Sequence, residues 1–78
     1  MNEELAERIN RMAERDQVMR RQMKQGGQYD ESLDRVNTEE LKNIVHTFGW
    51  PTIQLVGEEA SHNAWLLAQH ADHDVSFQ

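Results

Sequence analysis

The first 25 residues carry an apolar stripe at helical spacing, and no other feature constrains the fold of this chain as strongly. Its members recur at steps of four, three, seven and four residues: Leu5, Ile9, Met12, Met19 and Met23. Side chains three and four residues apart share one face of an α-helix. The sequence therefore predicts a long amphipathic helix over residues 3–25, which ends at the glycine pair 26–27.

One position in this stripe is charged. Asp16 stands where the spacing calls for an apolar side chain, so its carboxylate is expected to face the core. A carboxylate removed from water costs free energy unless it is paired with a cation, protonated or used in a site. Two interpretations stay open: Asp16 fixes the register of the helix, with Arg20 as its partner one turn later, or it belongs to a polar functional site.

A second helix is indicated by signals at both of its ends. Asn37 can cap the first turn, and Glu40 can complete a capping box with it. Gly49 stands where a helix commonly ends in the left-handed conformation. These signals predict a helix over residues 38–48, preceded by a linker over residues 26–36.

The third helix is expected over residues 58–74, after a corner over residues 49–57. Trp50-Pro51 turns the chain in this corner, because proline disfavours helical geometry at the residue before it. No strand pattern is strong enough for a sheet. The expected fold is all-α: one small domain, residues 1–78, in which the long N-terminal helix packs on a helical hairpin.

The composition favours a small acidic protein that gains stability from association. A chain of 78 residues buries little surface, and this one has no cysteine for a disulfide. We therefore expect self-association or a helical partner segment to complete the core. The longest apolar run, residues 64–68, is too short to span a membrane, and the acidic start lacks the features of a signal peptide. A cytoplasmic protein without membrane partners is expected.

Nucleic acid is not an expected partner either. The formal net charge is −6, although residues 1–27 hold six of the eight lysines and arginines. Five acidic residues are interleaved among them. Opposite charges at helical spacing brace a helix, whereas binding to a nucleic acid requires a surplus of positive charge.

His70 is the histidine with the best prospects for chemistry. It lies at the edge of the apolar face of the third helix, whereas His62 and His73 lie on the opposite side. Asp74 follows it by one turn, and Asn63 precedes it by two turns on the same strip. A histidine oriented by a carboxylate can act as a general acid or base. The alternative is structural: His70 packs on apolar neighbours while one ring nitrogen meets a carboxylate.

No metal site is predicted and no motif identifies a cofactor, although the His-x-x-His-Asp pattern of residues 70–74 leaves a bound metal as a weaker alternative. His70 and His73 point about 60° apart on a helix, which is unfavourable for a shared ligand. The pattern His-Glu-x-x-His and the glycine-rich phosphate loop are both absent from the sequence.

Several short motifs resemble those of an uncharacterised bacterial family of unknown function. They are Gly49-Trp50-Pro51-Thr52, Val56-Gly57, Ala64-Trp65-Leu66-Leu67 and Gln69-His70-Ala71-Asp72. The resemblance implies no reaction. It does imply that four residues belong to the polar set of this family: Asp16, Gln17, His70 and Asp72. Members of the family usually continue beyond Phe77-Gln78 into a further segment.

The expected function is that of a small enzyme-like or ligand-binding helical protein, with a polar pocket between its first and third helices. His70 would serve as acid or base, and Asp16 would orient it. Six more residues are expected to bind a small-molecule ligand: Gln17, Arg20, Asn63, Asp74, Trp50 and Trp65. Arg20 would meet an anionic group, and the two tryptophans would form an apolar wall. The competing interpretation is a non-catalytic interaction or oligomerisation module in which Asp16 sets register.

Overall fold

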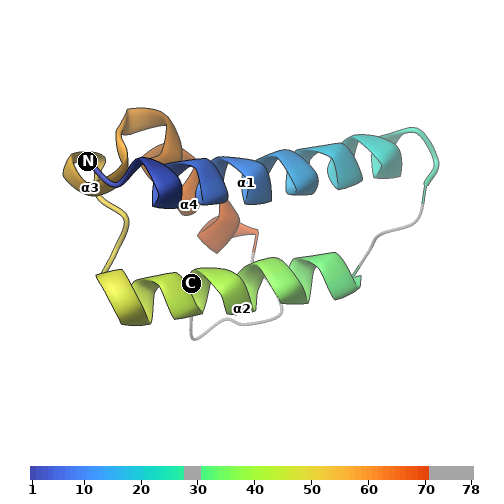
Figure 1. Cartoon of the computed structure of the whole chain (residues 1–78). Coiled ribbons are helices and arrows are strands. Elements are labelled where there is room, and N and C mark those ends of the chain that lie inside the picture. Colours follow the sequence, from blue (N-terminus) through green and yellow to red (C-terminus); the bar gives the residue numbers. More distant parts are fainter. Residues whose placement is uncertain (28–30, 71–78) are drawn as a thin grey trace.

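The computed structural model describes residues 1–27 and 31–70, and in this part of the chain it contains helices and no strand (Figure 1). The all-α fold expected from the sequence is therefore confirmed. The helices are α1 (Glu3–Lys24), α2 (Glu31–Phe48), α3 (Ile53–Val56) and α4 (Glu58–Gln69). In the described ranges, no helix is both long enough and apolar enough to cross a membrane.

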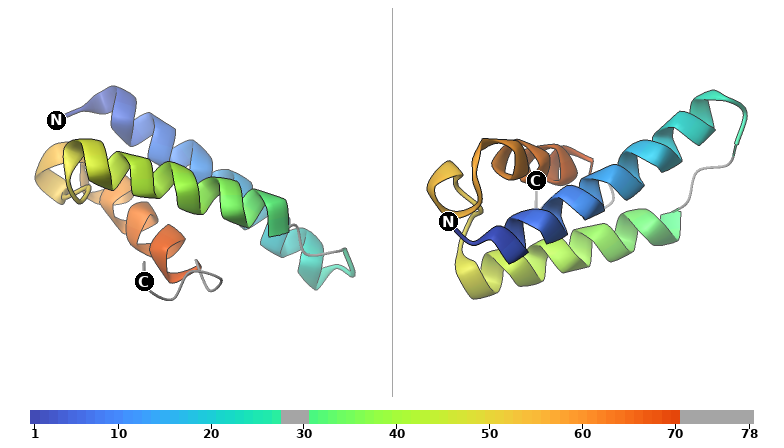
Figure 2. Two further views of the ribbon diagram at one scale, coloured as in Figure 1. Left: turned by 90° about the horizontal axis from the view of Figure 1, so that it is seen from below. Right: turned by 45° about the horizontal axis from the view of Figure 1, so that its top comes forward.

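The long helix α1 lies beside α2, and the two run in opposite directions (Figure 1). Helix α4 packs against both of them, and the short helix α3 fills the corner between α2 and α4 (Figure 2). The N-terminus is held at this corner, because the backbone N–H of Asn2 donates to the carbonyl of Leu55 over 2.6 Å. The long helix thus packs on the later helices, as the sequence predicts.

Helix α1 forms where its end signals place it. The Asn2 side chain accepts a hydrogen bond from the backbone N–H of Leu5 at 3.0 Å, which caps the first turn. Acidic residues occupy the first turn and basic residues the last, which suits the helix dipole. The predicted stripe is buried from Leu5 to Met19, while Met23 lies beyond the core and is exposed.

The predicted start of the second helix is wrong. Helix α2 begins at Glu31, so the segment 31–36 is helical and not a linker. Asn37 does not cap the helix. It lies buried within it, and its side-chain amide donates to the carbonyl of Met12 in α1 at 3.4 Å. Glu40 does not close a capping box, because its carboxylate lies between two arginines of α1. Both polar side chains serve contacts between helices, which local end signals cannot reveal.

Two glycines with positive φ shape the corner. Gly49 has φ +79° and follows α2 directly, as predicted. Gly57 has φ 86° and ψ 168°, a backbone region that only glycine adopts readily, and it separates α3 from α4. The expected extension of the last helix to residue 74 lies outside the described residues.

The interior has an apolar half and a polar half. The apolar half lies towards the corner, and its largest fully buried side chains from the two long helices are Ile9, Met12, Leu41 and Ile44. Further along the same two helices, the buried positions are mainly polar: Asp16, Asp34, Asn37 and Thr38. Because α4 ends beside this second half, its last residues can meet the buried polar groups.

Candidate functional site

The site begins with the buried carboxylate of Asp16, whose residue is only 2% exposed. Arg20 follows one turn later in α1, and its Nε lies 3.2 Å from each carboxylate oxygen of Asp16. This contact is an ion pair within one helix, at the i, i+4 spacing expected from the sequence. The desolvation cost of Asp16 is therefore offset in part by a neighbouring guanidinium.

His70 supplies the second partner of Asp16, from the end of α4. Its Nδ1 lies 2.6 Å from Oδ2 of Asp16. An ionised carboxylate can only accept a hydrogen bond, so Nδ1 carries the proton and donates. In a neutral ring, Nε2 is then an acceptor. The His70 side chain remains 27% exposed, so part of it reaches solvent.

Asp34 in α2 is a member of this network that the predicted set of site residues lacks. It is 4% exposed, and its Oδ1 lies 3.7 Å from Nη2 of Arg20. The missed signal is spacing: positions 34, 37, 38 and 41 lie three and four residues apart, as one helical face requires. That face could have been found only by continuing α2 upstream of residue 38.

The network therefore links three helices through one hydrogen bond to a histidine and two ion pairs. His70 of α4 contacts Asp16 of α1, which contacts Arg20, which contacts Asp34 of α2. A histidine whose Nδ1–H is held by a buried carboxylate has a fixed ring orientation and, in its neutral form, an unprotonated Nε2. This arrangement can accept, donate or relay a proton at Nε2. Within the described ranges, no group of three or more acidic or histidine side chains is arranged to hold a metal ion.

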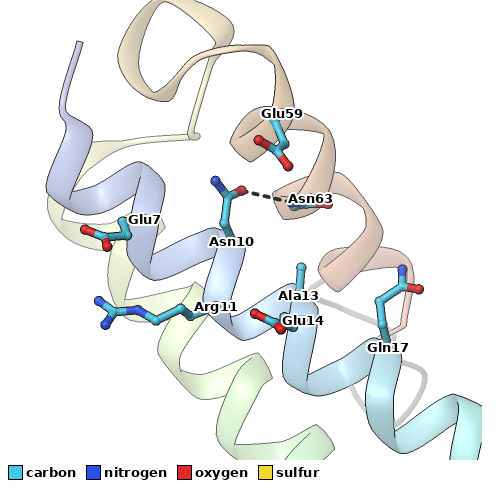
Figure 3. Close-up of a pocket in the computed structure, with 8 residues that line it drawn as sticks. All are labelled: Glu7, Asn10, Arg11, Ala13, Glu14, Gln17, Glu59 and Asn63. Atoms are coloured by element: carbon cyan, nitrogen blue, oxygen red, sulfur yellow. Dashed lines mark hydrogen bonds between the residues drawn. The ribbon is translucent and has the colours of Figure 1, made fainter.

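Gln17 and Asn63 share a groove that His70 does not line. They line a groove of about 380 Å³ between α1 and α4, together with Glu7, Asn10, Arg11, Ala13, Glu14 and Glu59. Across this groove, the Asn63 side-chain amide donates to Oδ1 of Asn10 at 2.9 Å (Figure 3). Neither Asp16 nor His70 lines it. The structure therefore brings Asp16, Arg20 and His70 together, but it puts Gln17 and Asn63 in a neighbouring groove.

The two tryptophans expected to form an apolar wall are both exposed. Trp50 at the corner is 42% exposed, and Trp65 in α4 is 51% exposed. Trp65 instead stacks on the ring of His62, with ring centroids 6.1 Å apart, on the outer face of α4. Asp74, also expected to bind ligand, lies outside the described residues.

A comparison with protein families gives a match over nearly the whole chain. Residues 3–78 match the model of DUF6624, described as a family of unknown function. The chain belongs to this family. No curated protein and no solved structure matches it.

Membership of DUF6624 agrees with the family of unknown function indicated by the motifs, and it assigns no reaction. The structure distinguishes among the polar residues that the resemblance assigned to the family. Asp16 and His70 are in direct contact, whereas Gln17 is exposed on the adjoining flank of α1. Asp72 lies outside the described residues. The contact between Asp16 and His70 is therefore the feature of this DUF6624 chain with the clearest chemical meaning.

Proposed function

We propose that this DUF6624 chain binds a small polar molecule at His70 and exchanges a proton with it. The observation that carries the proposal is the 2.6 Å contact between His70 Nδ1 and the buried Asp16 carboxylate. Such a contact presents Nε2 to a ligand as a proton acceptor. We further propose a bacterial, cytoplasmic setting, on the sequence resemblance and on the acidic, cysteine-free composition.

Each member of the network has a distinct role in this proposal. His70 is the group that would touch the ligand, and Asp16 is a positioning residue that holds its ring. The role first expected for Arg20, contact with an anionic ligand, is replaced by a structural one. Two carboxylates already flank its guanidinium, those of Asp16 and Asp34. Arg20 thereby stabilises the negative charge of Asp16 without facing the ligand.

The test is a screen for proton-transfer reactions with matched histidine variants. Activated esters and enolisable carbonyl compounds serve as reporter substrates, because both reactions depend on a general base. We expect at least one reporter whose turnover falls about a hundredfold or more in His70→Gln, the scale of general acid–base catalysis. His62→Gln is the control, because His62 is exposed on the outer face of α4. Equal turnover of every reporter by wild type and His70→Gln would rule out the catalytic proposal.

A second candidate function is self-association, and the exposed corner favours it. Three large apolar side chains there are exposed to solvent: Phe48, Trp50 and Ile53. Large exposed apolar groups that lie close along the chain are typical of interaction surfaces. In this alternative, Asp16 contributes by fixing the register of α1 against α4 through His70. The corner would then be the part of the molecule that meets a second copy or a helical partner.

A further inference from the structure

We propose that the chain has a second, independent binding site for a small phosphorylated molecule, on the flank of α1 that faces α2. Three arginines follow one strip of α1 at i, i+3 and i+7: Arg8, Arg11 and Arg15. They line a hollow of about 470 Å³ together with Glu14 of α1 and Glu40 of α2. Neither His70 nor Asp16 lines this hollow, so the proposal does not depend on the proton-transfer site.

The carboxylate of Glu40 brackets two of the arginines. Its Oε1 lies 3.5 Å from Nη2 of Arg8, and its Oε2 lies 3.5 Å from Nη2 of Arg15. One acidic side chain of α2 therefore contacts two guanidinium groups. The two arginines lie two helical turns apart in α1 and line the same hollow. These ion pairs draw both guanidinium groups towards α2.

Glu40 leaves most of the donor capacity of these arginines unused. Hydrogen bonds between a guanidinium and a carboxylate are commonly about 2.7–2.9 Å long, and the observed contacts are longer. In the described part of the chain, Oε2 of Glu40 is buried and accepts no hydrogen bond, even though Arg15 is close. Each guanidinium has five N–H donors. The two ion pairs with Glu40 therefore leave most of the N–H donors of Arg8 and Arg15 available.

Arg11 supplies a positive charge that Glu40 does not pair with. Among the described residues, 1–27 and 31–70, no carboxylate forms an ion pair with Arg11. Its side chain extends away from α4, as Figure 3 shows. Arg11 thus lies between Arg8 and Arg15 in the sequence, and its own N–H donors are available. Three guanidinium groups face two carboxylates in the lining of the hollow, which leaves a local surplus of positive charge on an acidic protein.

This donor set fits a phosphate monoester better than a carboxylate. A phosphate monoester has three terminal oxygens and up to two negative charges, and guanidinium groups bind such oxygens in pairs. A carboxylate offers two oxygens and one charge, so it cannot use three arginines. Glu14 on the lining and the net charge of −6 disfavour a long polyanion such as nucleic acid. We therefore assign the site to a small phosphorylated molecule.

The experiment is a titration of the full chain with phenyl phosphate, inorganic phosphate and acetate, followed by amide NMR. We expect both phosphates to shift the amide signals of residues 8–15 and of residue 40. Acetate should bind about tenfold more weakly, because it forgoes at least one charged hydrogen bond. Equal affinity for acetate and phosphate would overturn the assignment to a phosphorylated ligand.

Matched charge variants separate a built site from general electrostatic attraction. Arg11→Gln removes one positive charge from the hollow without breaking the Glu40 contacts, and Arg21→Gln removes one from the exposed end of the same helix. We expect Arg11→Gln to weaken phenyl phosphate binding about tenfold and Arg21→Gln to leave it nearly unchanged. Equal effects of the two variants, or shifts spread over the whole chain, would overturn the proposal. Reporter turnover at His70 is expected to be the same in both variants, so the two sites are tested separately.

Discussion

At the scale of single residues, the buried carboxylate of Asp16 brings Arg20 and His70 together. Its two oxygens lie near one guanidinium and one imidazole, and the residue is almost entirely buried. The sequence indicated this position because a carboxylate interrupts an apolar stripe, and it indicated His70 because of its place on the wheel of the last helix. It did not place Asp34 in the site, since the contact of Asp34 with Arg20 depends on the path of α2. The sequence predicts which residues share one face of a helix. It does not predict which second helix packs against that face.

Asp16→Asn tests whether this carboxylate is needed for stability. The amide can accept a hydrogen bond through its oxygen, but its NH₂ group would face either the Arg20 guanidinium or the His70 Nδ1–H. We expect a loss of about 1–3 kcal/mol in the free energy of unfolding, the usual cost of a mispaired buried polar group. Urea denaturation measures it, and Glu14→Gln on the exposed side of α1 is the control, with a change below about 0.5 kcal/mol. Unchanged stability of Asp16→Asn would show that the network contributes nothing to folding.

At the scale of elements, α2 shows where local signals mislead. Asn37 and Glu40 have the identities and spacing of a capping box, yet the helix begins at Glu31. Their side chains meet α1 instead, at the Met12 carbonyl and at Arg8 and Arg15. Contacts between helices outweigh the stabilisation of about 1 kcal/mol that a cap provides. The C-terminal signal was reliable because Gly49 acts through its own backbone, with φ +79°.

Asn37→Leu tests the role of this residue inside α2. Its Oδ1 is buried and lacks a hydrogen-bond partner among the described residues, and its amide makes a long bond of 3.4 Å. Replacing such a group by an apolar side chain of similar shape removes a desolvation cost. We expect a gain of about 1 kcal/mol in unfolding free energy, which exceeds that of Asn43→Leu, an exposed control for helix propensity. A loss of stability would show that Asn37 makes a required polar contact.

Gly57→Ala tests the junction between α3 and α4. Its φ of 86° and ψ of 168° lie in a region that is nearly exclusive to glycine. An added Cβ would also stand 2.9 Å from the sulfur of Met1. We expect a loss of about 1–3 kcal/mol, measured by thermal unfolding. Ser61→Ala, one turn into α4, should change stability little, and equal effects of the two would contradict the backbone argument.

At the scale of the whole molecule, the division of the interior explains why the site lies where it does. The apolar half packs α1, α2 and α4 together near the corner, which fixes their relative positions. The polar half then holds the chain of His70, Asp16, Arg20 and Asp34 on this rigid base. The sequence predicted the class of fold and the apolar half from periodicity. It did not predict that Trp50 and Trp65 lie exposed, because burial depends on surfaces that another element must supply.

The exposed corner leads to a prediction about association. If Phe48, Trp50 and Ile53 meet a second copy, wild-type protein should be a dimer or larger in light scattering coupled to size-exclusion chromatography. Ile53→Asp should shift it towards the monomer, because a charge in an apolar contact is costly. Val36→Asp is the matched control, since Val36 is an exposed apolar residue of α2 away from the corner. A wild-type protein that stays monomeric at every concentration would contradict self-association at this surface.

In the proposed site, the buried carboxylate of Asp16 holds the ring of His70 and leaves Nε2 free to exchange a proton. The most direct test is ¹⁵N NMR of the imidazole nitrogens, at a pH where the His70 ring is neutral. We expect the proton on Nδ1 and an unprotonated Nε2 in wild type, because the ionised Asp16 carboxylate accepts the bond from Nδ1–H. A neutral His70 with its proton on Nε2 would contradict the account.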